Sequence, residues 1–352
     1  MVKDINPGSP GSEPHYFNRI SDTTYFIAND GTHGEELWKS GGTEAGTVMV
    51  KDINSEPGSS NIGMICDIGG TLMFAATESV NATELWKSDR TEAGTSIVKD
   101  IYTGPEDFNP DQLTVANGVL FFRADDGRDS KPWKSNGTAE GTDVVSNIES
   151  DPGSSTPGPF AAAGSTILFQ AFTPSDMEEL WMTDGPYTGA AILMDINVGG
   201  TSNPAWLETV GSEVFFSANS GGTVGRELWK SEGTDEGTIL MKDIYEGSSD
   251  SSPSYLTCCR ETLFFMAYDL STGCELYKSD GTLGGTVLVK DINEGAGDSY
   301  PFGFQIFGDH VFFGATDGLY GYELWKTDGT ETGTVMVKDI KPGIQSGHES
   351  LE

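Results

Sequence analysis

The stretch Glu36-Leu37-Trp38-Lys39-Ser40-Gly41-Gly42-Thr43-Glu44-Ala45-Gly46-Thr47 decides the fold, because versions of it return along the whole chain. Its aromatic residue recurs at a nearly constant interval, at Trp38, Trp86, Trp133, Trp181, Trp229, Tyr277 and Trp325. The successive spacings are 48, 47, 48, 48, 48 and 48 residues. A fixed period of about 40–50 residues indicates a solenoid or a β-propeller.

Each repeat unit contains four short apolar runs, which in the first unit are residues 15–20, 24–28, 36–39 and 47–53. Strand-length runs rich in Val, Ile, Phe and Trp, bounded by Gly, Pro, Asp and Ser, predict β-strands, which we label A (innermost) to D. A solenoid of this period would have fewer and more evenly spaced turns. The pattern therefore predicts an all-β, seven-bladed β-propeller of four antiparallel strands per blade over residues 1–343, with 344–352 as a tail.

The turn between strands C and D carries two recurring glycines. The later one is present in every unit, at Gly46, Gly94, Gly141, Gly189, Gly237, Gly285 and Gly333. The earlier one is replaced once, by Arg90. Because glycine accepts positive φ without steric penalty, both positions are expected to serve a tight connection, with nearby Asp and Thr side chains bonding to the backbone.

The full motif also marks a family. The chain resembles the ELWxxDGTxxGT-repeat proteins, and the last unit carries the pattern from Glu323-Leu324-Trp325 through Asp328-Gly329-Thr330 to Gly333-Thr334. The resemblance extends over all seven units, with local departures such as Lys131-Pro132-Trp133. It implies a propeller-like repeat module of secreted bacterial proteins, located outside the cell or at its surface, and it implies no particular reaction.

The charge balance narrows the possible partners. The 352 residues contain 54 Asp and Glu against 20 Lys and Arg, a formal net charge of −34. Phosphate contacts need a surplus of Lys and Arg, so nucleic acid is excluded as a partner, and anionic membranes are disfavoured. No run approaches the roughly 18 apolar residues of a membrane span, and the first residues show no signal-peptide pattern. Since much of the acid excess lies in the periodic turns, it is mostly architectural.

Exposed aromatic residues are expected where the chain enters strand A. A proline recurs there, at Pro14, Pro110, Pro159, Pro204, Pro253 and Pro301, and the residue two positions beyond it varies. Tyr16, Trp206 and Tyr255 occupy this variable position, and Phe302 lies beside it in the last unit. These four residues are the predicted ligand-binding positions at the channel mouth, where aromatic rings stack on sugars or anchor proteins. Packing between blades is the alternative interpretation.

Carboxylates in the B–C loops suggest a second kind of site. Asp30, Asp126, Asp269 and Asp317 lie beside turn residues, where carboxylate and carbonyl oxygens could coordinate Ca²⁺. The chain has no EF-hand spacing, and Asp-Gly is also a common turn dipeptide. Calcium is thus a possible cofactor, and turn formation alone is the alternative.

Catalytic signatures are missing from the sequence. The four histidines do not recur between units, and no nucleophile elbow, zinc-protease helix or phosphate loop is present. No catalytic residues are assigned. The cysteines, Cys66, Cys258, Cys259 and Cys274, have no metal-binding spacing; they are expected as free thiols, as a Cys259–Cys274 bridge or as a vicinal pair.

Strand D occurs an eighth time, because Val2-Lys3-Asp4-Ile5 repeats Val337-Lys338-Asp339-Ile340. We predict that the C-terminal copy completes the last blade through its hairpin, which leaves Val2–Ile5 outside that sheet. The alternative is a closure in which Val2–Ile5 pairs with residues 323–326 instead. The surplus copy also suggests that the chain was cut from a longer protein containing such repeats. We expect a monomer or a part of a larger multidomain chain.

The sequence as a whole favours a non-catalytic extracellular binding or adhesion module that presents a propeller face to a glycan, matrix or protein ligand. A propeller-type polysaccharide hydrolase or lyase and a purely structural repeat module are the alternatives. A carboxylate pair in a deep cavity would favour the enzyme.

Overall fold

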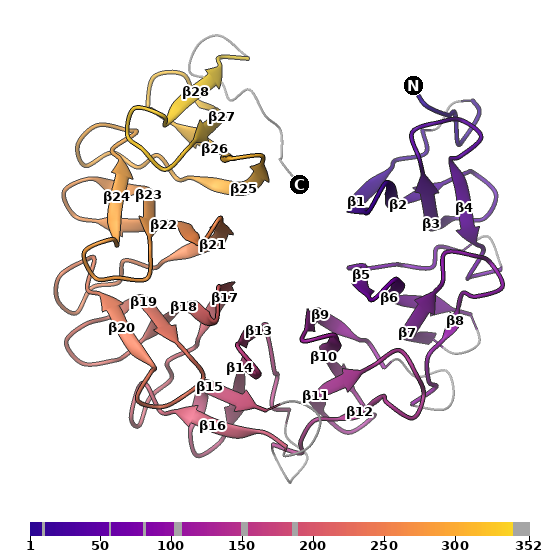
Figure 1. Ribbon diagram of the computed structural model, residues 1–352, viewed down its shortest axis with the longest axis horizontal. Helices are drawn as coiled ribbons and strands as arrows, with labels where there is room; N and C mark the ends of the chain where they lie inside the picture. Colours follow the sequence, from indigo (N-terminus) through magenta and orange to yellow (C-terminus); the bar gives the residue numbers. More distant parts are fainter. Residues whose placement is uncertain are drawn as a thin grey trace. The chain divides into compact units, whose positions relative to one another are not determined.

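The computed structural model describes residues 1–8, 11–55, 58–79, 82–101, 108–148, 154–184 and 189–340. Within these ranges the chain is all-β and forms seven four-stranded antiparallel sheets, the blades of a seven-bladed β-propeller. Every sheet is a meander in which strands A to D pair in chain order (Figure 1). No helix among the described residues has the length and apolarity needed to cross a membrane.

The chain divides into two compact units, Met1–Phe160 with Gly185–Ala190, and Ala161–Asp184 with Ala191–Glu352. The first three blades consist of β1 (His15–Ile20), β2 (Thr23–Asn29), β3 (Glu35–Ser40), β4 (Val48–Lys51), β5 (Cys66–Ile68), β6 (Thr71–Glu78), β7 (Ala82–Ser88), β8 (Ser96–Ile97), β9 (Asp111–Ala116), β10 (Val119–Asp125), β11 (Ser130–Ser135) and β12 (Asp143–Val144). The last four blades consist of β13 (Phe160–Ala163), β14 (Thr166–Thr173), β15 (Met177–Thr183), β16 (Ala191–Met194), β17 (Ala205–Val210), β18 (Glu213–Asn219), β19 (Arg226–Ser231), β20 (Ile239–Lys242), β21 (Ser254–Cys259), β22 (Thr262–Asp269), β23 (Gly273–Ser279), β24 (Val287–Lys290), β25 (Phe302–Phe307), β26 (His310–Thr316), β27 (Tyr322–Thr327) and β28 (Val335–Lys338).

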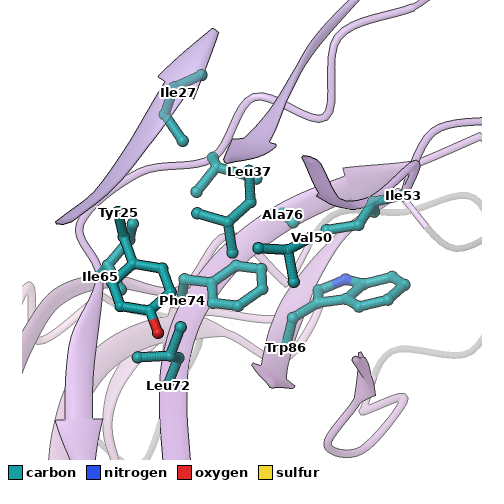
Figure 2. Close-up of a cluster of buried hydrophobic side chains, with 11 residues drawn as sticks. Tyr25, Ile27, Leu37, Val50, Ile53, Ile65, Leu72, Phe74, Ala76 and Trp86 are labelled. Atoms are coloured by element: carbon teal, nitrogen blue, oxygen red, sulfur yellow. The ribbon is translucent and has the colours of Figure 1, made fainter. Parts of the chain in front are cut away.

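The core of each unit lies between neighbouring blades. At the first junction, Leu37, Val50 and Ile53 of blade 1 pack on Phe74 and Trp86 of blade 2. Figure 2 shows Val50 and Ile53 beside the indole of Trp86. The same residue positions form the clusters at the junctions of blades 2 and 3, 4 and 5, 5 and 6, and 6 and 7. Strands B and C therefore supply apolar residues to both faces of a blade, which explains why a modest apolar content is sufficient.

The motif glutamate at the start of strand C fastens the loop that leaves strand D. Glu275 is fully buried, and its two carboxylate oxygens accept hydrogen bonds from Ile292 N at 2.9 Å and Asn293 N at 3.2 Å. Ser299 Oγ, in the loop to the next blade, donates to the same carboxylate at 2.7 Å. Glu36 and Glu227 make corresponding bonds. In blade 3, Lys131 stands in this position and pairs instead with Asp126 and Asp129.

The turn between strands C and D needs positive φ at the earlier of its two recurring glycine positions, as predicted, but not at the later one in most units. The earlier position has positive φ wherever it is described, with 83° at Gly281, 87° at Gly329 and 78° at Arg90. The later glycine has another cause in most units, because Gly94, Gly285 and Gly333 are outside the positive-φ region. A Cβ at these three positions would collide with the turn aspartate of the same hairpin. Space, and not backbone conformation, therefore requires glycine there.

The closing strand of the last blade is also as predicted. Strand β28 pairs with β27 in the sheet β25-β26-β27-β28, so the C-terminal copy of strand D completes blade 7. Val2–Ile5 belong to no strand. The expected tail, 344–352, lies outside the described residues, and the single domain over 1–343 stays a prediction.

Candidate functional site

Strand A is irregular at the variable position that follows the recurring proline. Its pairing with strand B shifts register between His15 and Asn18 in blade 1, and equivalent shifts occur in blades 3, 5, 6 and 7. The residue at the shift has positive φ in all five blades, at Tyr16 (50°), Gln112 (53°), Trp206 (58°), Tyr255 (56°) and Gly303 (64°). These shifts are β-bulges, which re-aim side chains and are frequent beside functional sites.

The bulges present large side chains to solvent. Tyr16, Trp206 and Tyr255 are exposed, although the rings of Trp206 and Tyr255 also contact each other across neighbouring blades. A bulky residue with positive φ is strained by about 1–3 kcal/mol and persists where its surroundings impose that conformation. Tyr16 contacts the ring of its neighbour His15 edge-on, with ring centroids 4.9 Å apart. Three blades thus direct an aromatic ring outward from a strained backbone.

Two of the predicted ligand-binding residues lie together in the second unit. The ring centroids of Trp206 and Tyr255 are 4.9 Å apart, and Tyr255 is 6.3 Å from Phe304 on strand β25. Tyr255 and Phe302 also line one cavity of about 350 Å³, whose remaining walls are Met266, Tyr300, Pro301 and Tyr322. A cavity of this size lies at the lower end of the range for small-ligand sites.

Three residues of this cavity were not predicted from the sequence: Tyr300, Met266 and Tyr322. Tyr300 directly precedes Pro301 of the recurring series, and this position could have drawn attention to it. Tyr322 starts strand β27, where its ring contacts Phe302 edge-on at 5.8 Å between centroids. No periodic signal marks it, because the residue before the motif glutamate differs between units. We call Trp206, Tyr255, Tyr300, Phe302 and Tyr322 the aromatic patch.

One carboxylate, Asp298, contacts the aromatic patch, and a second, Glu208, lies on the same strand as Trp206. A hydrogen bond from the Tyr300 hydroxyl to Asp298 raises the pKa of Tyr300 to about 12. Asp298 Oδ1 also accepts a bond from Cys274 N at 2.8 Å, which fixes this carboxylate at the cavity. On strand β17, Glu208 Oε1 accepts a bond from Cys258 N at 2.9 Å, and burial raises the pKa of Glu208. The patch therefore combines apolar ring surface with the carboxylate of Asp298 at its edge.

The four loop aspartates proposed as calcium ligands organise their own turns. Asp30 Oδ1 accepts bonds from Thr32 N and His33 N, both at 2.9 Å, and Asp317 Oδ1 accepts from Leu319 N and Tyr320 N. Asp269 accepts from Ser271 N at 2.8 Å, and Asp126 pairs with Lys131. Within the described residues, no group of three or more His, Cys, Asp or Glu is arranged to hold a metal ion. Calcium binding stays a prediction.

The four cysteines are free thiols in this structure. Burial raises the pKa of Cys66 and of Cys274 to about 11, so both are protonated at neutral pH. A protonated thiol is a poor nucleophile, which gives these residues a packing role.

The comparisons with known proteins address the fold directly. No family model and no curated protein matches the chain. Solved structures do: prolyl oligopeptidase B from Galerina marginata is 11% identical with a TM-score of 0.56, over 94% of this chain and 50% of that one. Pyrococcus horikoshii acylaminoacyl peptidase is 9% identical with a TM-score of 0.50, over 92% and 52%. The propeller domain of the Pyrococcus furiosus Trilobed protease is 12% identical with a TM-score of 0.50, over 92% and 97%.

These matches establish the fold and correct the expected function. The chain spans about half the length of the prolyl oligopeptidase and acylaminoacyl peptidase, and nearly all of the isolated propeller domain. The prediction of an adhesion or glycan-presenting module is wrong, because the similar propellers belong to peptidases. The polysaccharide-acting alternative has no support from them either. At 9–12% sequence identity, the similarity to these structures shows the shared fold alone.

Proposed function

We propose that this chain is a non-catalytic propeller that accompanies a peptidase and receives peptide chains on the aromatic patch. The observation that carries the proposal is the coverage of the matches: the chain overlaps nearly all of a protease's propeller domain and half of a complete peptidase. In the proposed role, the propeller holds the peptide while the reaction takes place on a separate catalytic part. The extracellular location and the calcium binding expected from the sequence remain predictions.

The aromatic patch has the properties that such a role needs. Trp206 and Tyr255 offer adjacent ring faces, and the cavity beside them is lined by three tyrosines and a phenylalanine together with Met266 and Pro301. Rings with two side-chain torsions bury much area at small entropic cost, which makes Tyr and Trp frequent anchors for peptides. Asp298, which accepts a hydrogen bond from Tyr300, favours a peptide with a basic residue next to its apolar one.

Calorimetric titration of the chain with short acetylated peptides tests this proposal. Peptides with a Phe-Arg or Pro-Arg pair in a Gly/Ser background are compared with an all-Gly/Ser peptide of equal length. We expect binding of the first two, weakened at least tenfold by Trp206→Ala or Tyr255→Ala. Tyr320→Ala is the matched control, because Tyr320 is an exposed tyrosine on a B–C loop and outside the aromatic patch.

Two results would overturn the proposal. If the apolar peptides bind no better than the Gly/Ser peptide, the patch does not receive peptides. If the chain alone hydrolyses them, as followed by mass spectrometry, it is not the non-catalytic partner of a peptidase.

A further inference from the structure

Four aromatic rings from blades 6 and 7 line the cavity of the aromatic patch. Tyr255, Tyr300, Phe302 and Tyr322 surround its space of about 350 Å³ together with Met266 and Pro301, and we call the four aromatic residues the cage. All six lining residues belong to the second compact unit, so this unit alone supplies the walls of the cavity.

The rings of Phe302 and Tyr322 stand at a steep angle to each other. Their centroids are 5.8 Å apart and their planes meet at 71°, so these walls fit a rounded group better than a flat ring. Phe302 reaches its place because its partner on strand β26 is Gly314, where a Cβ would lie 2.6 Å from Phe302 Cζ. The other six units carry a side chain at this position: Ile27, Ala75, Arg123, Gln170, Ser217 and Met266.

Negative charge lies beside two of the rings. The Tyr300 hydroxyl donates a hydrogen bond to Asp298, whose Oδ1 also accepts from Cys274 N at 2.8 Å. Burial, and after it the charge of Asp298, raise the pKa of Tyr322. The face of an aromatic ring is itself the negative end of its quadrupole. The cage therefore attracts positive charge, although none of the described residues that line it is a carboxylate.

The lining also distinguishes between kinds of cation. Among the described lining side chains, the hydroxyl groups of the three tyrosines are the only oxygen or nitrogen atoms. A primary ammonium or a guanidinium group would exchange water at its N–H groups for few acceptors, which costs free energy. A quaternary ammonium group carries methyl groups in place of N–H, and ring faces attract its charge directly. The cage is therefore best matched to a methylated ammonium group.

We propose that the cage binds a trimethylammonium group, held by the faces of its four rings and by the charge of Asp298. The group is carried by a free compound such as choline or by a trimethylated lysine of a peptide. The first source goes beyond the peptide role proposed above, and the second rests on that role. A compound with an anion next to its ammonium, such as betaine, binds less well, because Asp298 and the net charge of −34 repel it.

Proton NMR titration of the full chain with choline and with 3,3-dimethylbutan-1-ol tests the proposal. The alcohol has the shape of choline with a neutral carbon in place of the nitrogen, so the pair isolates the charge. We expect the methyl signal of choline to move upfield through the ring currents of the cage, and its dissociation constant to be at least fivefold below that of the alcohol. Salt raised from about 0.05 M to about 0.5 M should weaken only the binding of choline.

Two variants link this binding to the cage. Phe302→Leu should weaken choline binding at least fivefold, because it removes a ring face and keeps the wall apolar. Phe307→Leu is the matched control, since Phe307 is an exposed phenylalanine on the same strand, β25, and is not part of the cavity lining. Asp298→Asn keeps an oxygen for Cys274 N, and it should weaken the binding of choline and leave that of the alcohol unchanged.

Equal affinity for choline and the neutral alcohol would overturn the proposal, as would unchanged choline binding in Phe302→Leu. If the circular dichroism spectrum shows that Phe302→Leu is unfolded, Tyr255→Leu replaces it, because Tyr255 is exposed. The choline titration contains no peptide, so its failure leaves the proposed peptide role standing, and the failure of that role leaves the choline result standing.

A Gly/Ser peptide with one trimethyllysine separates the two sources of the group, with the same peptide carrying unmodified lysine as its control. Affinity for the trimethyllysine peptide that equals or exceeds the affinity for choline assigns the cage to a peptide. A lower affinity assigns it to a free compound. The lysine peptide should bind at least fivefold more weakly than the trimethyllysine peptide, and equal binding of the two would contradict the preference for a methylated ammonium group.

Discussion

The C–D hairpin and the bulge in strand A use positive φ in opposite ways. In the hairpin the positive-φ position is glycine in nearly every blade. Side-chain hydrogen bonds hold the turn: Thr330 Oγ1 accepts from Gly333 N at 2.9 Å and donates to Asp328 Oδ1 at 2.7 Å. In strand A, tyrosine, tryptophan and glutamine occupy the strained conformation and project outward. The hairpin minimises strain and varies only at Arg90, whereas the bulge accepts strain and varies between blades. This difference separates the scaffold of the blade from its candidate binding surface.

The largest expected effect concerns the scaffold. Glu275→Ala leaves the donors Ile292 N, Asn293 N and Ser299 Oγ without their acceptor in a buried site, which should lower the free energy of unfolding by about 2–4 kcal/mol. Urea denaturation measures it. Glu294→Ala, at an exposed glutamate of the same loop, is the control and should have little effect. Equal stability of the two variants would show that the buried glutamate is not an anchor.

The same glutamate should make stability depend on pH. Burial raises the pKa of Glu275, and of Glu36, to about 7 from an ordinary 4.5. The folded chain therefore holds these protons more tightly than the unfolded chain, so the stabilisation is complete below about pH 4.5 and is lost as pH rises through about 7. We expect the free energy of unfolding to fall between pH 5 and pH 8.

Glu275→Gln separates this contribution from the general repulsion of a chain with net charge −34, which both proteins share. Its free energy of unfolding should fall less between pH 5 and pH 8 than that of the wild type. An identical dependence in the two proteins would contradict a raised pKa of Glu275.

The smallest expected effect concerns the bulge. Tyr16→Gly should raise the free energy of unfolding by about 0.5 kcal/mol, because glycine adopts φ near 50° without strain. Gly303→Ala should lower it by about 1 kcal/mol, since it introduces a Cβ at φ 64°. Tyr16→Ala is the matched control, because it removes the ring and keeps the strain. If Tyr16→Gly lowers the free energy of unfolding more than Tyr16→Ala does, the backbone at Tyr16 is not strained.

The features predicted correctly from the sequence are those that recur in every unit. Seven units of one period are sufficient for the blade count, the strand order and the closing strand of blade 7, because a repeated residue serves the same contact each time. The sequence did not predict the buried role of the motif glutamate, since a carboxylate in a polar motif looks exposed until its donors are placed. The reason for Gly285 was also misjudged, because a collision with Asp280 depends on the folded hairpin.

The candidate site was harder to predict, because it consists of residues that do not recur. Trp206 and Tyr255 stood out through their shared position after a proline, and the structure brings them together. Tyr300 and Tyr322 reach the same cavity from a loop and from strand C, and their grouping follows from how strands of neighbouring blades lie side by side. Their function could not be read from composition, and the expected adhesion role was wrong for that reason.

The glutamate anchor has a consequence for how such a chain changes in length. The anchor joins strand C of one blade to the loop that leads into the next, so its contacts straddle the boundary of the sheet. Duplication or loss of a gene segment of one whole period, close to 48 residues, restores every anchor wherever the break falls. Duplication or loss that stops part-way through a unit separates a glutamate from its loop. Ancestral propellers of this kind would therefore gain and lose blades in whole periods, with the point of recombination left free.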